Sequence, residues 1–227
     1  MRKLLFLMWI PIITTALFTA CPGPSVEVVI YAAGYYYDGD HDVAAFWKDG
    51  MRTDLTDGTA NARANSIYIY DGDVYAAGYY ESGGVKVAAY WINGGTPIDL
   101  TGGTNDGWVN SIFVDADGIY AAGVHNDGSD DFPVLWENTT EKPLPTGSVK
   151  GTATSVFVRN GNVYVAGFYD FDATYWVNEV KITPDLSTTV YSKALDITVD
   201  STGAVYVAGF DSDAFTRASY WLDDDTG

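Results

Sequence analysis

A unit of about 44 residues recurs along most of the chain and limits what the chain can fold into. A five-residue run (Ile or Val, Tyr, Ala or Val, Ala, Gly) occurs five times and closes at Gly34, Gly78, Gly123, Gly167 and Gly209. Successive glycines lie 44, 45, 44 and 42 residues apart, and a tryptophan follows each of them, at 47, 91, 136, 176 and 221. Such a period indicates a row of similar units, each of which buries its apolar surface against its neighbours.

Each unit contains four short segments of strand character, which we name A to D in chain order. Position B is the five-residue run and position C ends in the tryptophan. Position A covers 66–69, 111–114, 155–158 and 196–199, and position D covers 54–56, 99–101 and 143–145. The first unit has no clear A segment and the last has no D segment.

Turn residues separate these segments. Tight hairpins between A and B are predicted at Asp71-Gly72, Asn160-Gly161 and Asp117-Gly118. Similar hairpins between C and D are predicted at Asp49-Gly50 and Asn93-Gly94. No segment keeps a 3.6-residue apolar period, so we expect almost no helix after residue 21.

The strand faces favour one all-β architecture. In position A of the second unit, Ile67 and Ile69 face one side while Tyr68 and Tyr70 face the other, so both faces are apolar. A sandwich sheet usually leaves one face in water, whereas a propeller blade is packed between two neighbours. We therefore expect residues 29–227 to form a β-propeller of four-stranded antiparallel blades. It has about five blades, with the first and last incomplete, or is a fragment of a larger ring.

Composition excludes several classes of protein. The chain of 227 residues is 47% hydrophobic, which excludes disorder, and it has a single cysteine, which excludes a disulfide scaffold. Its formal net charge of −18 argues against a nucleic-acid partner, because such partners require a basic surface.

The first residues have the layout of an export signal. Arg2 and Lys3 precede the uncharged stretch 4–20, which ends at Cys21. Residues 17–21, Leu-Phe-Thr-Ala-Cys, resemble the lipobox of bacterial lipoproteins. That resemblance implies a signal peptide at 1–20, acylation of Cys21 and a tether at 21–28. It also implies attachment to the bacterial cell envelope through the lipid, at the outer membrane or cell surface. The alternative is an incidental thiol at Cys21.

The repeat itself resembles those of kelch-like propellers. It is still more similar to repeat-bearing lipoproteins of bacteria, whose units read roughly Ala-Asn-Ser-Ile, Val-Tyr-Ala-Ala-Gly-Tyr, Tyr-Trp-x-Asn-Gly and Asp-Leu-Thr. The similarity spans residues 29–221. It implies a fold and a location in the envelope rather than an activity.

The sequence contains only weak signals for metal-binding or catalytic residues. The loop 38–42, Asp-Gly-Asp-His-Asp, has the alternating aspartates of calcium loops, but Val43 and Asp49 replace the glycine and glutamate that such loops require. We interpret it as a solvated loop, and His41 and His125 as exposed loop residues. We predict no metal, no cofactor and no catalytic residues.

The informative positions are those that vary within the regular unit. Three residues before the aligned Ser or Asp of position A stand Arg63, Trp108, Thr152 and Lys193, with Tyr191 nearby. If these segments begin at one end of the ring, Arg63, Trp108, Tyr191 and Lys193 form a candidate site for a sugar or an acidic peptide. The alternative is that they are ordinary loop residues.

Three functions remain open. The first is an exported, lipid-anchored binding module for a protein or a carbohydrate, without catalysis. The second is a propeller-type carbohydrate hydrolase or lyase that uses Asp196 and loop aspartates as acids. The third is a structural surface protein.

Overall fold

The computed structural model describes residues 28–147, 149–182, 191–212 and 216–223. These residues contain eighteen β-strands and no helix, which confirms the all-β prediction. No helix that could cross a membrane is therefore present among them. The predicted signal peptide, Cys21 and nearly all of the tether at 21–28 lie outside the described residues.

The strands form five antiparallel sheets, in each of which neighbouring strands follow one another in the chain. Sheet 1 contains β1 (Tyr31–Tyr37), β2 (Asp42–Lys48) and β3 (Met51–Asp54). Sheet 2 contains β4 (Ala62–Tyr70), β5 (Asp73–Ser82), β6 (Val85–Ile92) and β7 (Ile98–Asp99). Sheet 3 contains β8 (Gly107–Val114), β9 (Ile119–Asn126), β10 (Asp131–Glu137) and β11 (Thr140–Pro143). Sheet 4 contains β12 (Gly151–Arg159), β13 (Asn162–Tyr169), β14 (Asp172–Val177) and β15 (Val180–Ile182). Sheet 5 contains β16 (Tyr191–Val199), β17 (Val205–Ser212) and β18 (Thr216–Asp223).

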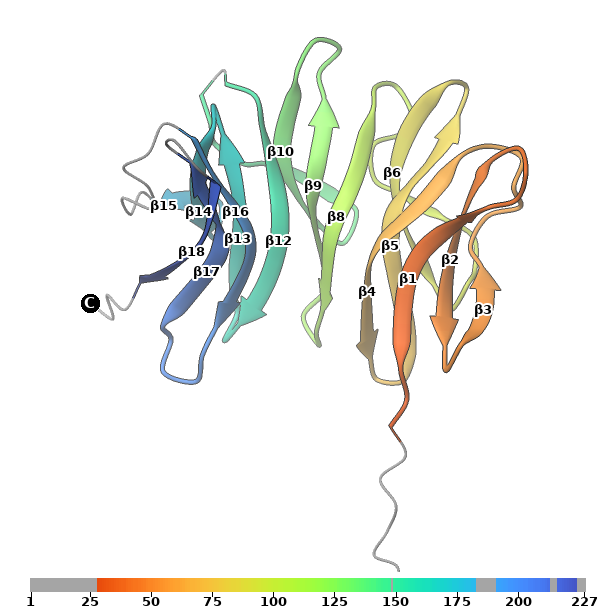
Figure 1. Cartoon of the computed structure of the whole chain (residues 1–227), viewed down its shortest axis with the longest axis horizontal. Coiled ribbons are helices and arrows are strands. Elements are labelled where there is room, and N and C mark those ends of the chain that lie inside the picture. Colours follow the sequence, from red (N-terminus) through yellow and green to blue (C-terminus); the bar gives the residue numbers. More distant parts are fainter. Residues whose placement is uncertain (1–27, 148, 183–190, 213–215, 224–227) are drawn as a thin grey trace, which may run out of the picture.

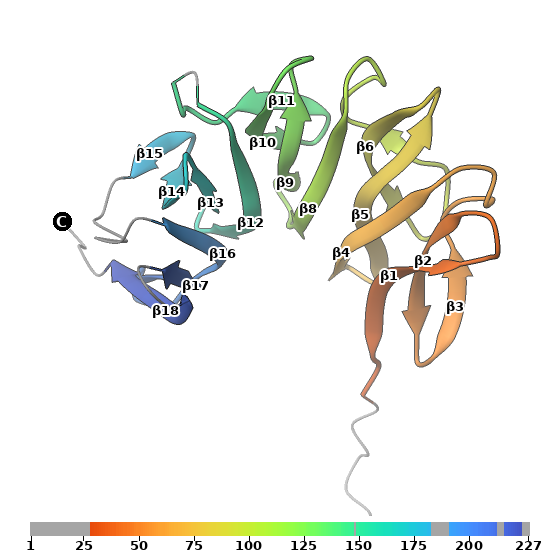
Figure 2. The same cartoon turned by 45° about the horizontal axis from the view of Figure 1, so that its top comes forward.

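The sheets follow the repeat. Sheet 1 has strands B, C and D, sheets 2 to 4 have all four, and sheet 5 has A, B and C. The D strands β3, β7 and β11 lie one to three residues before the predicted positions 54–56, 99–101 and 143–145, and β15 was not located from the sequence. They stand side by side around an arc, with the A strands β4, β8, β12 and β16 on its concave side (Figures 1 and 2). Sheets 1 and 5 lie at the two ends of this arc (Figure 2). None of the hydrophobic clusters among the described residues joins these two sheets, and closure into a ring is not seen there.

Each pair of neighbouring sheets shares a hydrophobic cluster. We call the side of a sheet that meets the next sheet its forward face and the other side its backward face. In sheet 2, Ile67 and Trp91 belong to the cluster shared with sheet 1, whereas Tyr68 and Tyr90 belong to the cluster shared with sheet 3. Burial on both faces is therefore confirmed for this sheet. Because each cluster draws on two units, no unit could bury its apolar residues alone.

Most predicted hairpins form. The turn pairs at 71–72 and 160–161, and likewise 49–50 and 93–94, have positive φ angles at both residues, as type I′ turns require. The prediction of a tight turn at Asp117-Gly118 is wrong, since β8 ends at Val114 and β9 begins at Ile119. Here the carboxylate of Asp115 accepts hydrogen bonds from the backbone N–H groups of 117 and 118, which stabilises a longer loop.

The repeated glycine is required by a β-bulge. Each A strand shifts register by one residue, between Ala64 and Ser66 in β4 and at the equivalent places in β8, β12 and β16. The bulge pushes the carbonyl oxygen of Arg63 against Gly78, where an added Cβ would lie only 1.9 Å from that oxygen. A side chain at this position would clash with backbone, which explains the glycine at 78, 123, 167 and 209, where an A strand pairs with strand B.

The extra residue of three of the four bulges links neighbouring sheets along the concave side. The side-chain amide of Asn65 donates to the carbonyl of Val109 at 2.7 Å, and that of Asn110 donates to the carbonyl of Ala153 at 2.8 Å. The Thr154 hydroxyl makes the same link to Ala194 O at 2.9 Å. These bonds hold the A strands in place relative to one another. They therefore also hold the positions of the residues at which those strands begin.

Candidate functional site

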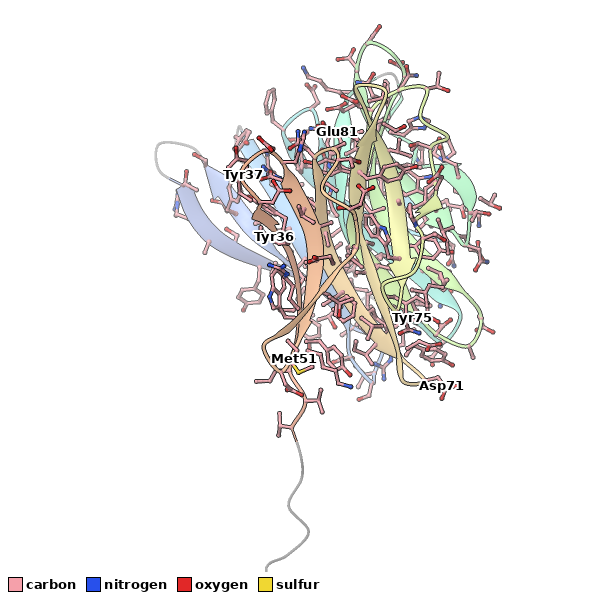
Figure 3. The ribbon with its side chains drawn as sticks, turned by 90° about the vertical axis from the view of Figure 1, so that its right-hand side faces the viewer. Tyr36, Tyr37, Met51, Asp71, Tyr75 and Glu81 are labelled. Atoms are coloured by element: carbon pink, nitrogen blue, oxygen red, sulfur yellow. The ribbon has the colours of Figure 1, made fainter. Side chains whose placement is uncertain are left out.

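The A strands begin at one end of the sheets, together with the loops between strands B and C. We call this end the upper rim. Figure 3 shows Tyr36, Tyr37 and Glu81 toward this end and Met51 and Asp71 at the opposite end. Strand β1 starts at that opposite, lower end (Figure 1). The side chains predicted to bind a ligand thus lie at the upper rim, far along the strands from the first described residue.

A contact recurs at the rim of three of the four junctions between sheets. The residue five positions before the tryptophan of one sheet approaches the beginning of the A strand of the next sheet. At the junction of sheets 1 and 2, the Arg63 guanidinium donates to the Asp42 carboxylate at 2.6 and 2.9 Å. This bond raises the pKa of Arg63. The guanidinium also lies 4.1 Å from the centre of the Tyr35 ring. Arg63 thereby fills this junction.

The junction of sheets 2 and 3 is filled differently. Lys86 occupies the place of Asp42, and its ammonium nitrogen lies 5.5 Å from the ring centre of Trp108, the counterpart of Arg63. The backbone N–H of Lys86 donates to the Asp106 carboxylate at 2.9 Å. The cation–π contact closes this junction as the ion pair closes the first.

Aromatic rings fill the junction of sheets 4 and 5. The Phe171 and Tyr191 rings lie 5.4 Å apart, and the ammonium nitrogen of Lys193 lies 4.0 Å from the Phe168 ring centre and 5.6 Å from that of Tyr191. Of the residues predicted to bind a ligand, Tyr191 and Lys193 are thus brought together. Arg63 and Trp108 each serve a separate junction.

The junction of sheets 3 and 4 remains open. Asp131 stands in the place of Asp42, but its counterpart on β12 is Thr152, which is much shorter than Arg63 or Trp108. A pocket of about 140 Å³ lies here, lined by Asp131, Lys150, Gly151, Thr152, Phe168, Asp170 and Phe171. Two aspartates, one lysine and two phenylalanines are therefore among the residues that line a single small cavity.

The backbone at this pocket is strained in a way that exposes an aromatic ring. Asp170 and Phe171 form the turn between β13 and β14 with φ angles of 47° and 71°, a conformation that phenylalanine rarely adopts. The Phe171 side chain remains 53% exposed. Turn geometry does not favour a phenylalanine here, although its ring contacts that of Tyr191, and residues held in such strained conformations cluster at functional sites.

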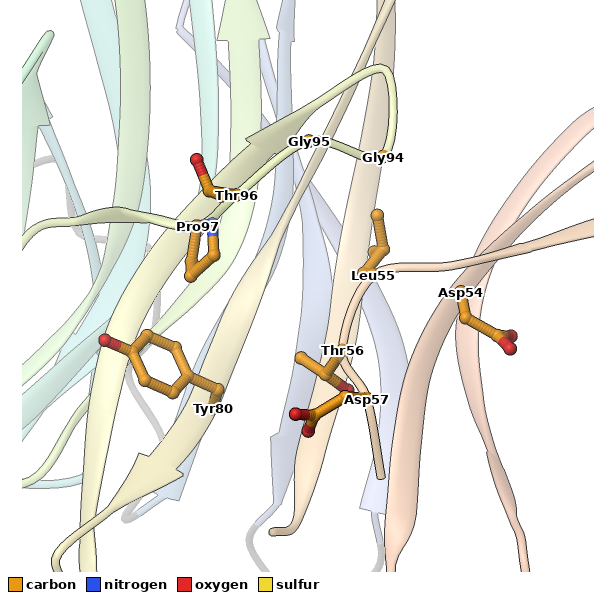
Figure 4. Close-up of a pocket in the computed structure, with 9 residues that line it drawn as sticks. All are labelled: Asp54, Leu55, Thr56, Asp57, Tyr80, Gly94, Gly95, Thr96 and Pro97. Carbon is orange, nitrogen blue, oxygen red and sulfur yellow. The ribbon is translucent and has the colours of Figure 1, made fainter. Parts of the chain in front are cut away.

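A larger cleft of about 670 Å³ lies between sheets 1 and 2 (Figure 4). Its residues are Asp54, Leu55, Thr56, Asp57, Tyr80, Gly94, Gly95, Thr96 and Pro97. The Tyr80 hydroxyl donates to Asp99 at 2.8 Å, and burial together with this bond raises the pKa of Tyr80 to about 12. The β6–β7 hairpin forms one wall of this cleft. None of the charged residues that line the cleft makes an ion pair or a cation–π contact with the facing sheet, whereas such contacts are present at the rim.

The acidic groups of the loops act as turn caps. The Asp38 carboxylate accepts hydrogen bonds from the backbone N–H groups of Asp40 and His41, which lower its pKa. On the concave side, Asp196 accepts a bond from the Ser155 hydroxyl at 2.6 Å. No group of three or more His, Cys, Asp or Glu residues within the described ranges is placed to hold a metal ion.

Sequence reasoning missed most of the pocket. The sequence analysis does not identify Lys150, Phe168 or Phe171 as binding residues, and Asp131 and Asp170 belong only to its general set of loop aspartates. The signal that identifies the pocket is a comparison of paired positions: Asp42 with Arg63, Lys86 with Trp108, and Asp131 with Thr152. Each pair lies about twenty residues apart and becomes meaningful only when the contact between the two sheets is known.

No protein-family model matches the chain, and no curated protein matches it at a significant level.

Proposed function

We propose that the chain is a non-catalytic binding module that holds a carbohydrate in the pocket between sheets 3 and 4. The observation that carries the proposal is the open junction at Thr152, beside an exposed Phe171 held in a left-handed backbone conformation. Arg63 and Trp108 fill the corresponding space at two other junctions. A short residue at one position of a regular series leaves room for a ligand.

The chemistry of the pocket suits a neutral sugar. Aromatic rings pack against the apolar C–H faces of a pyranose, while a few fixed polar groups orient its hydroxyls. Asp131 and Asp170 offer acceptors and Lys150 offers donors, so both hydrogen-bonding roles of a hydroxyl can be satisfied. The formal net charge of −18 disfavours an anionic ligand.

We also propose that the five sheets are blades of a β-propeller and that the protein is exported and anchored through a lipid on Cys21. The repeat and the burial of both sheet faces support the propeller. The leader sequence and the single cysteine support the anchor. Strand β1 begins at the end of the sheets opposite the upper rim (Figure 1), so a lipid attached before β1 would leave the pocket directed away from the membrane.

A glycan array, followed by calorimetric titration with the best-bound neutral oligosaccharide, tests the binding proposal. Thr152→Trp should fill the pocket as Trp108 fills its own junction and lower the affinity at least about tenfold. Phe171→Asn removes the ring but suits the left-handed backbone, so it should weaken binding without unfolding the turn.

Tyr37→Asn is the matched control, since Tyr37 is 66% exposed and lies toward the upper rim of sheet 1, away from the pocket. It should leave the affinity unchanged. Absence of binding to every neutral glycan, or unchanged binding by both pocket variants, would overturn the proposal.

A further inference from the structure

A second pocket, of about 310 Å³, lies on the backward face of sheet 3 at a place where that sheet departs from the repeat. The position two residues after the repeated glycine is tyrosine in sheets 1, 2 and 4, at 36, 80 and 169, but it is His125 in sheet 3. The sequence interpretation of His125 as an exposed loop residue is wrong, since it lies in β9 with its side chain 26% exposed. The exception in the series therefore coincides with a cavity.

The imidazole of His125 is held in one orientation by a carboxylate. Its Nδ1 lies 2.8 Å from Oε2 of Glu141, which reaches it across β10 from β11. An ionised carboxylate only accepts hydrogen bonds, so Nδ1 carries the proton that joins the two groups. In the neutral ring Nε2 is then an acceptor, and it makes no hydrogen bond within the described part of the chain. The pair offers a ligand a fixed acceptor beside a negative charge.

The other polar groups of the pocket also mostly accept. The Asp127 carboxylate accepts hydrogen bonds from the backbone N–H groups of Asp130 and Ser129, which lower its pKa and keep it ionised. The side-chain N–H of Asn126 is already used, since it donates to Asp131 at 2.9 Å. No lysine or arginine is among the described residues that line the pocket. A ligand that complements this wall must supply donors and a positive charge.

The rest of the wall is apolar and consists of Phe132, Pro133, Val134 and Pro143. Such side chains can bury the methylene groups of a short alkyl chain, and the ring of Phe132 attracts a cation. The volume of the pocket is at the low end of the range for small-ligand sites, which is about 300–1,000 Å³. The formal net charge of −18 raises the local concentration of cations around the molecule.

We propose that this pocket binds a primary ammonium group on a short alkyl chain, as found in a lysine side chain or a free diamine. The ammonium donates to Nε2 of His125 and lies beside the carboxylates of Glu141 and Asp127, while its methylene groups pack against Phe132 and Pro143. The site is separate from the pocket between sheets 3 and 4, which has Lys150 on its wall and is suited to a neutral sugar.

Protonation of His125 should release the ligand. Histidine changes its charge between about pH 5 and 8, and the protonated ring has no acceptor at Nε2 and places a positive charge beside the ammonium. The charged residues that line the pocket with His125 are Glu141 and Asp127. On the side of sheet 2, Asp106 accepts a hydrogen bond from the backbone N–H of Lys86. Of these residue types, only histidine ordinarily titrates within this range of pH.

Calorimetric titration of the complete chain with two amines tests the proposal. Nα-acetyl-lysine amide and 1,5-diaminopentane should both bind at pH 8, and the tighter of the two shows whether a lysine side chain or a free diamine is the better ligand. The affinity should fall at least about tenfold between pH 8 and pH 5. The lysine derivative acetylated at Nζ has the same alkyl chain without the charge, and it should not bind.

Four variants assign the binding to this pocket. His125→Tyr gives sheet 3 the residue of sheets 1, 2 and 4, so it should fold normally and lose binding. Glu141→Gln should lower the affinity at least about tenfold. His125→Gln keeps an acceptor without a titrating group and should bind equally at pH 8 and pH 5. Asp130→Asn is the matched control, since it removes one exposed carboxylate from the same sheet outside the pocket, and it should bind like the unmodified chain.

Three results would overturn the proposal. The first is a failure of both amines to bind at pH 8. The second is equal binding of the derivative acetylated at Nζ, which would show that the pocket does not select a charge. The third is an equal loss of affinity for Asp130→Asn and Glu141→Gln, which would show that the amines are attracted only by the net charge of the molecule.

Discussion

Sheets 4 and 5 contain nearly the same side chains in very different surroundings. Tyr175 of sheet 4 is 2% exposed, and its hydroxyl donates to Asp223 of the neighbouring sheet, whereas Tyr220 at the equivalent place in sheet 5 is 77% exposed. The difference lies only in the presence of a following sheet. A residue of the repeat therefore has no fixed energetic role, because its role depends on whether another unit packs against it.

The largest contrast should come from truncating these two tyrosines. Tyr175→Ala should lower the free energy of unfolding by about 3–5 kcal/mol, because it leaves a cavity in the cluster between sheets 4 and 5. Tyr220→Ala should change it by less than about 0.5 kcal/mol. Urea titrations at low protein concentration measure both values. Equal losses for the two variants would show that the face of sheet 5 is covered in the monomer.

Substitution of the repeated glycine should affect stability differently in sheet 1 and in the inner sheets. Gly123→Ala places a Cβ about 2.0 Å from the carbonyl oxygen of Trp108 and should cost about 1–3 kcal/mol through displacement of the bulge. Gly34→Ala should be neutral or stabilising by up to about 1 kcal/mol, because its nearest neighbour is Trp47 at 3.4 Å and no A strand crosses it. Denaturation midpoints of the two variants check this contrast. A loss at Gly34 as large as at Gly123 would mean that a further strand pairs with β1.

Removal of a hydrogen bond between A strands on the concave side should lower the free energy of unfolding by a smaller amount. Asn110→Ala leaves the carbonyl of Ala153 without its donor and should cost about 1 kcal/mol. Leu195 occupies the same bulge position in β16 and is 48% exposed, so Leu195→Ala should change stability by less than about 0.5 kcal/mol. The same urea titration measures both. A marked loss at Leu195 would contradict the absence of a following sheet in the monomer.

The smallest expected effect is a decrease in the free energy of unfolding at alkaline pH. Burial raises the pKa values of Tyr90, Tyr120 and Tyr175, and that of Tyr80 rises to about 12. The folded state holds these protons more tightly than the unfolded chain, whose tyrosines titrate near pH 10. Their contribution is complete below about pH 10 and is lost as the pH rises toward 12. Tyr80→Phe should reduce this alkaline slope, and urea titrations between about pH 9 and 11 measure it. An unchanged slope would show that Tyr80 titrates normally.

Much of the fold could be predicted from sequence because its signals are local. Turn pairs such as Asp71-Gly72 fix a hairpin within a few residues, and alternation in 66–70 fixes the two faces of β4. The prediction failed at Asp117-Gly118, where the side chain of Asp115 stabilises a longer loop than the dipeptide suggests. The bulges were not predicted either, because the extra residue is recognisable only against the paired strand.

The candidate site could be predicted only in part. The sequence located the rim positions at Arg63, Trp108, Tyr191 and Lys193, since they vary within a regular unit. It did not show that these positions meet the beginning of strand C in the preceding sheet, so the space left by Thr152 could not be recognised. That space depends on side chains from two sheets.

The sequence by itself determined the strands, their order within each sheet and the burial of both faces, because periodicity and turn chemistry act over a few residues. Only the tertiary structure decided which junction of the rim is open and which faces at the ends of the arc are uncovered. Both depend on contacts between residues about 20 to 44 positions apart, and no local pattern records whether such a contact is made.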